Sequence, residues 1–306
     1  MTVTEPPAFV YDPAVHPRRL NLGCGYDHRE GYLNVDFQDF HSPDVVGDVR
    51  DLPVLPSDTF DEIIAIDVLE HLPRSDTAKG LAEWARLLAP GGSLHLQMPD
   101  VTACGRFLVE HDNQADHAQL ISQLFGTQGY TGDFHLAGFT DLTLVAVLRE
   151  AGFHHTELGT RDGWMLTSTS ELVAPGAEPD PLSVGWLAGF WPAESSEVAD
   201  WRWCDRQAEL LLVNHADGPI TVEVAGSVGR SPGDAAEVHV SGSPSDQWFD
   251  DVVAVPAVGE TGWGRTMVLA PGATRLRFAT ESAPLDVPDA RTLAFRFSDA
   301  HITVRG

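Results

Sequence analysis

The sequence predicts an α/β fold with a doubly wound, mostly parallel sheet, followed by an all-β domain of jelly-roll or sandwich type. Up to Glu171, short apolar runs alternate with helical patterns, which is typical of a parallel sheet covered by helices. Residues 173–185 hold three prolines and two glycines and are predicted to form a linker. Beyond them no helical pattern follows. We therefore expect two domains, residues 1–172 and 186–306.

In the first domain, six apolar runs are predicted as strands: Leu20–Leu22, Tyr32–Val35, Val45–Gly47, Glu62–Ile66, Ser93–Met98 and Met165–Ser170. A helix is expected over Thr77–Leu88, because its apolar residues share one helical face, and Pro90-Gly91-Gly92 should end it. A second helix is expected over Asp141–Ala151, with Thr140 or Asp141 as its cap and Gly152 as its stop.

In the second domain, eight short strands are punctuated by Gly, Pro, Ser or Asp, a spacing that favours a jelly-roll sandwich. They are Ala208–Asn214, Ile220–Ala225, Glu237–Ser241, Val252–Pro256, Thr266–Leu269, Arg275–Ala279, Leu293–Ser298 and Ile302–Val304.

Composition limits the partners of this chain. Its 306 residues suffice for two cores, and 19 basic against 45 acidic residues give a net charge of −26 at pH 7. Such a field repels phosphate backbones and anionic lipids, so we expect neither nucleic acid nor a membrane as partner. We find no apolar run long enough to span a bilayer and no secretory signal. Three widely spaced cysteines (Cys24, Cys104 and Cys204) favour a reduced, cytoplasmic compartment.

A Gly-x-Gly turn directly follows the first predicted strand, in Leu20-Asn21-Leu22-Gly23-Cys24-Gly25. Glycine lets a ligand approach the backbone closely. Asp36 ends the next strand, where a carboxylate can accept both hydroxyl hydrogens of a ribose. A nicotinamide site would need a third glycine opening a helix for the pyrophosphate, and the sequence lacks it. The pattern therefore favours a nucleoside ligand without phosphates.

Further fragments follow in a recognisable order: Gly47-Asp48-Val49, then Asp67-Val68-Leu69-Glu70-His71-Leu72, then Leu87-Leu88-Ala89-Pro90-Gly91-Gly92. Together, over about residues 18–172, they resemble the class I S-adenosylmethionine-dependent methyltransferases. The opening Leu-Asn-Leu-Gly-Cys-Gly…Gly-Tyr-Leu-Asn-Val-Asp is most similar to a subgroup associated with glycan and polysaccharide assembly.

The resemblance implies a Rossmann-like methyltransferase domain with S-adenosyl-L-methionine as its cofactor. By position, Gly23 and Gly25 would approach the methionine moiety and Asp36 would hold the ribose. Asp48 would face the adenine amine beside the Val49 backbone, with Asp51 as the competing acid. Asp67 would help to bind the amino acid end. We interpret Cys24 as a small spacer and Asp61 as structural.

The segment Thr131–Thr140 resembles a His-x-x-Gly-Phe-Thr stretch of the same subgroup and follows the fifth strand. Loops at the carboxyl ends of strands face the binding crevice, and an alcohol acceptor needs its proton removed. We therefore name His135 as the candidate catalytic base, with a loop-holding hydrogen bond as the alternative role. His71 is interpreted as structural, and Asp133 as a solvated acid that could instead orient His135.

No metal site is predicted. His111, Asp112, Asp116 and His117 form a cluster, but two histidines six apart on a helix point in different directions, unlike the i, i+4 pair of a zinc site. A solvated helix is the preferred interpretation of this segment.

The second domain carries Gly189–Glu194 and Trp201–Leu210, similar to a β-sandwich appended to bacterial glycan-assembly enzymes. Aromatic side chains can stack on sugars, but packing is the preferred role of Trp201 and Trp203. We expect O-methylation of a sugar hydroxyl on a nucleotide sugar, glycolipid or glycosylated metabolite. The second domain would bind the acceptor or form a homodimer. A non-catalytic glycan-binding protein with a vestigial methyltransferase half and a nicotinamide-dependent oxidoreductase are the alternatives.

Overall fold

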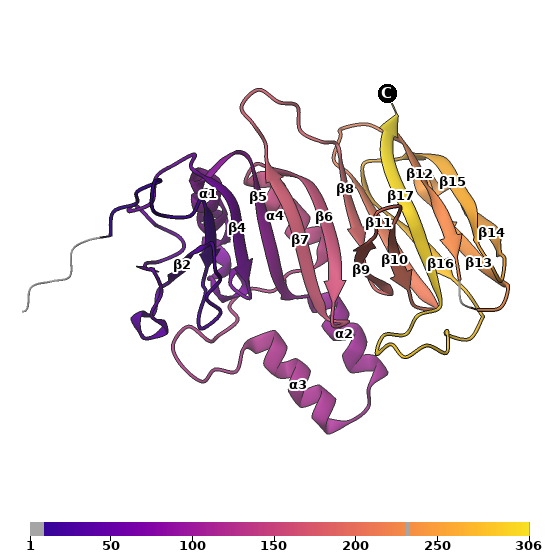
Figure 1. The fold of residues 1–306 in the computed structure, drawn as a ribbon, viewed down its shortest axis with the longest axis horizontal. Coiled ribbons are helices and arrows are strands. Elements are labelled where there is room, and N and C mark those ends of the chain that lie inside the picture. Colours follow the sequence, from indigo (N-terminus) through magenta and orange to yellow (C-terminus); the bar gives the residue numbers. More distant parts are fainter. Residues whose placement is uncertain (1–8, 231–232, 306) are drawn as a thin grey trace, which may run out of the picture. The chain divides into compact units, whose positions relative to one another are not determined.

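The computed structural model describes residues 9–230 and 233–305 (Figure 1). They divide into two units. Unit 1 comprises the chain up to His154 together with Ser168–Pro179, and unit 2 comprises His155–Thr167 together with the chain from Asp180 onward. None of the described helices combines the length and the apolar character that crossing a membrane requires.

Unit 1 contains a sheet and four α-helices. Its strands are β1 (Arg19–Leu22), β2 (Leu33–Asp36), β3 (Val45–Val46), β4 (Phe60–Ile66), β5 (Leu88–Pro99) and most of β7 (Met165–Leu172). Its α-helices are α1 (Thr77–Leu87), α2 (Val101–Glu110), α3 (Gln114–Phe125) and α4 (Asp141–Glu150), and a 3₁₀ turn, η2 (Leu69–His71), follows β4.

The strand order of this sheet is β7-β5-β4-β1-β2-β3, and β1 pairs in parallel with both β2 and β4. The chain moves outward from β1 towards β3, then returns to β4 and moves outward the other way through β5. The order therefore reverses between β1 and β4. Ligands of such sheets bind at this reversal, outside the carboxyl ends of the strands.

The two predicted helices of the first domain are confirmed. In α1, Leu81, Trp84 and Leu87 are buried on one face. α4 begins at Thr140, whose side chain forms a capping box with Thr143. The helix at α1 ends earlier than expected, because Leu88 already enters β5, and Pro90-Gly91-Gly92 lie inside this strand.

Several elements of this half were not predicted from the sequence. Residues 111–117 do not form one helix: His111 caps the end of α2 and Asn113 begins α3, its side chain accepting a hydrogen bond from Asp116 N. The strand β6 (Phe153–Arg161) was not predicted, because two of its buried residues, His154 and Thr156, are polar and interrupt the apolar alternation.

Unit 2 consists of strands, with no α-helix in the part that the structure describes. Besides β6 they are β8 (Leu182–Trp186), β9 (Phe190–Ser195), β10 (Asp200–Cys204), β11 (Gln207–Asn214), β12 (Ile220–Gly229), β13 (Ala236–Gly242), β14 (Phe249–Val255), β15 (Glu260–Leu269), β16 (Gly272–Ala279) and β17 (Phe295–Arg305). The orders β14-β13-β16-β11-β8-β6 and β15-β12-β17-β10-β9 define two groups that share one apolar core. The jelly-roll form of this arrangement stays a prediction.

Two expectations for this half need correction. The predicted linker is shorter than 173–185, because Leu182–Trp186 forms β8 and pairs with β11. The runs Leu293–Ser298 and Ile302–Val304 lie largely on one strand, β17. Between them Asp299 has a positive φ of 47°, and the register against β12 shifts by one residue, as in a β-bulge. The break that the sequence predicted between these two runs is therefore a β-bulge within a single strand.

Candidate active site

A cavity of about 400 Å³ lies in unit 1 at the carboxyl ends of the central strands. All six residues predicted to bind the cofactor line it: Gly23, Gly25, Asp36, Asp48, Val49 and Asp67. They come from the ends of four neighbouring strands, so the sheet brings together residues that are up to 44 positions apart.

The Gly-x-Gly turn needs both of its glycines for conformational reasons. Gly23 and Gly25 have φ values of +61° and +49°, which side chains disfavour. A Cβ on Gly23 would also lie 2.6 Å from Val68 Cγ2, whereas one on Gly25 would meet nothing within 4 Å. Gly25 therefore keeps one edge of the cavity open.

Asp36 is buried and already held by three donors. Its Oδ2 accepts from Gly25 N (2.9 Å), and its Oδ1 accepts from Gln38 N (2.8 Å) and contacts His41 Nδ1 (3.0 Å). His41 also lines the cavity and was not foreseen. The only sequence signal for His41 was its position five residues after Asp36, and an isolated histidine is a weak signal.

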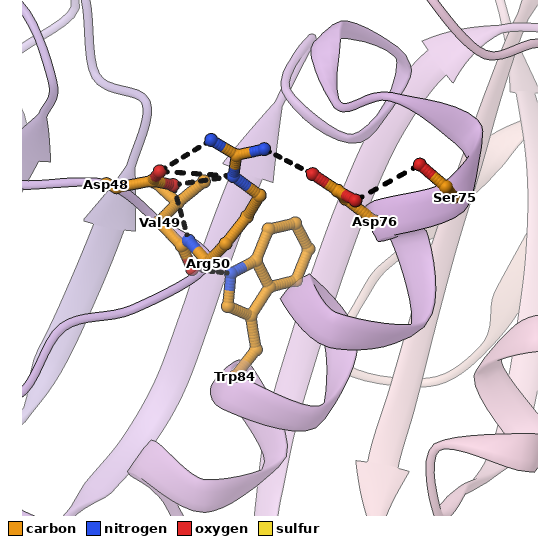
Figure 2. A network of polar contacts seen from close by, with 6 residues as sticks. All are labelled: Asp48, Val49, Arg50, Ser75, Asp76 and Trp84. Atoms are coloured by element: carbon orange, nitrogen blue, oxygen red, sulfur yellow. Dashed lines mark hydrogen bonds and ion pairs between the residues drawn. The ribbon is translucent and has the colours of Figure 1, made fainter.

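Two acids of the next loop, Asp48 and Asp51, were candidates for the adenine side of the site. Asp48 lines the cavity while Asp51 is not among its lining residues. Figure 2 shows that Asp48 contacts Arg50, which also pairs with Asp76 at the start of α1. The Arg50 guanidinium lowers the pKa of Asp48, so this carboxylate is ionised at neutral pH.

The Val49 backbone is fixed from inside the protein. The Trp84 indole Nε1 of α1 donates to the Val49 carbonyl oxygen at 2.9 Å, and the Trp84 ring is fully buried (Figure 2). The predicted adenine-binding loop is therefore anchored to α1.

Asp67 follows β4 directly and has a positive φ of 54°, an unfavourable conformation for a non-glycine residue. Its amide donates to Gln97 O at 2.9 Å, which ties the turn to β5. Asp61 lies in β4 and forms an exposed ion pair with Arg18, which agrees with its interpretation as structural. Burial, followed by the charge of Asp36, raises the pKa of the Cys24 thiol to about 12, which agrees with a spacer and not a nucleophile.

His135 lies beside a second cavity of about 690 Å³ and is not among the residues that line the first. Leu136 lines both cavities. The rings of His135 and His71 meet edge to face with centroids 4.6 Å apart. Burial lowers the pKa of both imidazoles, and His71 lowers that of His135 further, so both are neutral at pH 7.

Asp133 holds its own loop. Its Oδ2 accepts from Gly129 N at 3.0 Å and from the Thr127 hydroxyl. These bonds go to Thr127 and Gly129 and not to His135, so the alternative in which Asp133 orients His135 gains no support.

Glu70 is the residue that sequence reasoning missed most clearly. It is 2% exposed, and no described group donates a hydrogen bond to either carboxylate oxygen. Burial, and then the charge of Asp67, raise its pKa well above the usual value. The signal was present as an acid inside the apolar run Val68-Leu69-Glu70-His71-Leu72.

In the 111–117 cluster, which the sequence did not favour as a metal site, the histidines contact the main chain and a neighbouring ring. His117 Nε2 contacts the main-chain oxygens of Leu108 (3.1 Å) and His111 (2.7 Å), and the His111 ring stacks on Phe107. The group of potential metal ligands that the described residues do bring together is Glu70, His71 and His135, whose ligand atoms all lie within 4.8 Å of one another.

The aromatic residues of β10 in unit 2 pack around an arginine. Arg296 of β17 lies 5.9 Å from the Trp201 ring and 5.8 Å from the Trp203 ring, measured from the guanidinium carbon to each centroid. Both tryptophans are half-buried. These contacts agree with the packing role preferred from the sequence.

Comparison with known proteins finds a match within the first domain. Residues 20–96 match the family model described as a methyltransferase domain. This range begins in β1 and ends in β5, and it holds all six cavity-lining residues named above. The cofactor of this domain is S-adenosylmethionine. No curated protein matches the chain.

Solved structures match part of this chain at low identity and low TM-score. A possible exported protein from Bordetella parapertussis is 16% identical with a TM-score of 0.39, and the match covers 52% of this chain and 63% of that one. The CurJ carbon methyltransferase is 18% identical with a TM-score of 0.35, covering 54% and 50%. A methyltransferase from Methanosarcina mazei is 15% identical with a TM-score of 0.38, covering 54% and 100%. The chain thus spans less than two thirds of the first two proteins.

Proposed function

We propose that this protein is an S-adenosylmethionine-dependent methyltransferase that methylates a sugar hydroxyl on a nucleotide sugar, a glycolipid or a glycosylated metabolite. The observation that carries the activity is the match of residues 20–96 to the methyltransferase domain, whose strand ends surround one cavity. The sugar acceptor rests on the resemblance of the sequence to glycan-associated enzymes.

The cavity suits the cofactor in size and charge. Its volume of about 400 Å³ lies in the range of small-molecule sites. Asp36, Asp48 and Asp67 give it a negative lining, which favours a ligand with a positive sulfur. Asp36 would hold the ribose hydroxyls, and its fixed carboxylate needs no rearrangement to do so.

When bound, the cofactor supplies a methyl group on a sulfonium, and transfer to a hydroxyl oxygen releases S-adenosylhomocysteine and a proton. The protein must therefore orient the acceptor in line and dispose of this proton. We propose that His135 acts at the acceptor hydroxyl, since it is neutral and borders the second cavity. This cavity would hold the acceptor.

Cofactor binding is tested with an Asp36→Asn variant. The amide removes the charge and places an NH2 donor opposite one of the two amides that Asp36 now accepts, Gly25 N or Gln38 N, so we expect affinity for S-adenosylmethionine to fall about 10- to 100-fold by calorimetry. Exposed Asp39→Asn is the matched control and should bind as the wild type does. Equal binding by Asp36→Asn and wild type would refute the ribose role.

Activity is tested by incubating the intact protein with the cofactor and panels of nucleotide sugars and glycosides, with mass spectrometry to detect the gain of one CH₂ unit. A modified sugar oxygen supports the proposal, and methylation confined to a nitrogen or carbon acceptor contradicts it. A cytoplasmic location and a homodimer stay predictions. The oxidoreductase and vestigial-enzyme alternatives gain no support from the comparisons.

A further inference from the structure

Three side chains that are distant in the sequence converge beside the cofactor cavity. Glu70 and His71 end the turn η2 after β4, and His135 lies 64 residues further on, between α3 and α4. One ligand atom of each lies within 4.8 Å of those of the other two. We propose that Glu70, His71 and His135 bind a divalent transition-metal ion.

The Glu70 carboxylate needs a partner. It is 2% exposed, and neither of its oxygens accepts a hydrogen bond from a described group. Burying an uncompensated carboxylate costs several kcal/mol in proteins. Imidazole nitrogens of His71 and His135 lie within 4.8 Å of a carboxylate oxygen of Glu70, and they offer lone pairs to a cation as the carboxylate does. A bound cation satisfies all three groups together.

Both histidine rings are held by main-chain groups, those of Phe134 and Gly132 for His71 and that of Gln123 for His135. His71 Nδ1 lies 3.2 Å from the Phe134 carbonyl oxygen, and because a carbonyl only accepts, Nδ1 carries the hydrogen. The lone pair is then on Nε2. The His135 ring likewise bonds to the main chain of Gln123. A backbone carbonyl on the second nitrogen is the usual support of a metal-binding histidine.

The backbone fixes the two halves of the cluster against each other. The amides of Leu136 and Ala137 both donate to the Glu70 carbonyl oxygen, at 2.7 and 3.0 Å. His135 N also donates to Phe125 O at 3.2 Å. The ligands are therefore positioned by main-chain hydrogen bonds before any ion binds, as a preorganised site requires.

The chemistry of the ligands selects the ion. Two imidazoles and one carboxylate suit Zn²⁺, Mn²⁺, Fe²⁺ or Co²⁺, whereas Mg²⁺ and Ca²⁺ prefer oxygen ligands alone. Three protein ligands leave coordination positions open for water or a substrate. Metal–ligand bonds of about 2.0–2.2 Å require only small side-chain movements from the present spacing.

The position of the ion gives it a role that rests on the proposed methyl transfer. His71 lines the cofactor cavity, His135 lines the second cavity, and the ion would lie where the two meet. An acceptor hydroxyl bound to it would lose its proton to water more readily, since a divalent ion lowers the pKa of a bound hydroxyl. In this assignment His135 acts on the acceptor through the ion instead of accepting the proton itself.

Metal binding is tested directly on the intact, tag-free protein after treatment with a chelator. Titration with Co²⁺ should give ligand-field absorption bands that saturate at one equivalent. Glu70→Gln, which keeps the size of the side chain, and His135→Ala should each weaken Co²⁺ binding by more than about tenfold. His111→Ala is the matched control, and its Co²⁺ spectrum should equal that of the wild type. Thermal melts establish that each variant is folded.

Absence of Co²⁺ binding by the wild type, or undiminished binding by folded Glu70→Gln and His135→Ala, would overturn the metal site. Calorimetry with S-adenosylmethionine on the same samples separates this result from the proposed function. Methylation that persists in excess chelator leaves the enzyme proposal intact and rejects the ion. Co²⁺ binding by a protein that does not bind the cofactor would support the metal site and reject the proposed function.

Discussion

At the scale of single residues, the site is organised by buried polar groups whose partners come from different turns. Asp36 accepts from Gly25 N and Gln38 N and contacts His41, so the turns that follow β1 and β2 are joined through one carboxylate. A side chain fixed by several bonds loses little conformational entropy when a ligand binds. This would favour tight binding of the ribose that we propose Asp36 to hold.

The three cysteines should be inert in the folded protein. Cys24, Cys104 and Cys204 are at most 4% exposed. Burial raises the pKa of all three thiols, to about 12 for Cys24 and about 11 for Cys104, so each is protonated at pH 8 and lacks the reactive thiolate. A colorimetric disulfide reagent at pH 8 should label none of them within minutes, but all three in guanidinium chloride. Fast labelling of native protein would contradict this burial.

At the scale of elements, helix α1 supports the loop that is predicted to contact adenine. Its Trp84 donates to the Val49 carbonyl, and Asp76 before its first residue pairs with Arg50 (Figure 2). The conformation of this loop therefore depends on a helix about 30 residues away in the sequence.

A Trp84→Phe variant tests this dependence. Phenylalanine keeps an aromatic ring in the core but removes the donor, which leaves the Val49 carbonyl unpaired and some space unfilled. We expect a loss of about 1–3 kcal/mol in the free energy of unfolding, measured with urea, and weaker binding of S-adenosylmethionine. Trp248→Phe is the control, since that side chain is 70% exposed and should have little effect. Unchanged stability and affinity in Trp84→Phe would show that the loop does not rely on α1.

The turn η2 is the second element that connects distant parts of unit 1. It supplies His71 to the cavity of about 400 Å³, and its Glu70 carbonyl accepts the amides of Leu136 and Ala137. A change in the acceptor-side segment 135–137 can therefore reach the cofactor side through main-chain contacts. The proposed metal ion would strengthen this same connection.

At the scale of the whole molecule, charge is the dominant property. Acidic residues outnumber Lys and Arg by 45 to 19, so most carboxylates have no basic partner to pair with. The resulting repulsion destabilises the folded state at low ionic strength. It also disfavours nucleic acid as an acceptor, which remains a prediction.

The melting temperature should accordingly rise with salt. Going from about 0.01 to about 1 M NaCl shortens the screening length from roughly 30 to roughly 3 Å, which weakens the net repulsion of the excess acids more than it weakens the short-range ion pairs. Differential scanning calorimetry across this range measures the effect, with sucrose at matched osmolality as the uncharged control. A melting temperature that is constant or falls with NaCl would contradict the role of repulsion.

Much of the fold was predictable because it depends on local patterns. The helices near Thr77 and Asp141 follow from amphipathic spacing and caps, and the strand-end positions of Gly23 and Asp36 follow from motif order. Elements with buried polar residues, such as β6 with Thr156, could not be found this way. Their apolar alternation is broken by side chains that find partners only in the folded protein.

The sequence by itself determined the cofactor class and predicted six residues that line the cavity of about 400 Å³ in unit 1, since these lie at fixed offsets from strands whose pattern is local. Only the tertiary structure decided that Glu70 and His71 meet His135, that His41 holds Asp36, and that Trp84 holds Val49. The physical reason is that such contacts join segments separated by 5 to 65 residues. Their proximity is set by strand order and loop packing, which no local pattern records.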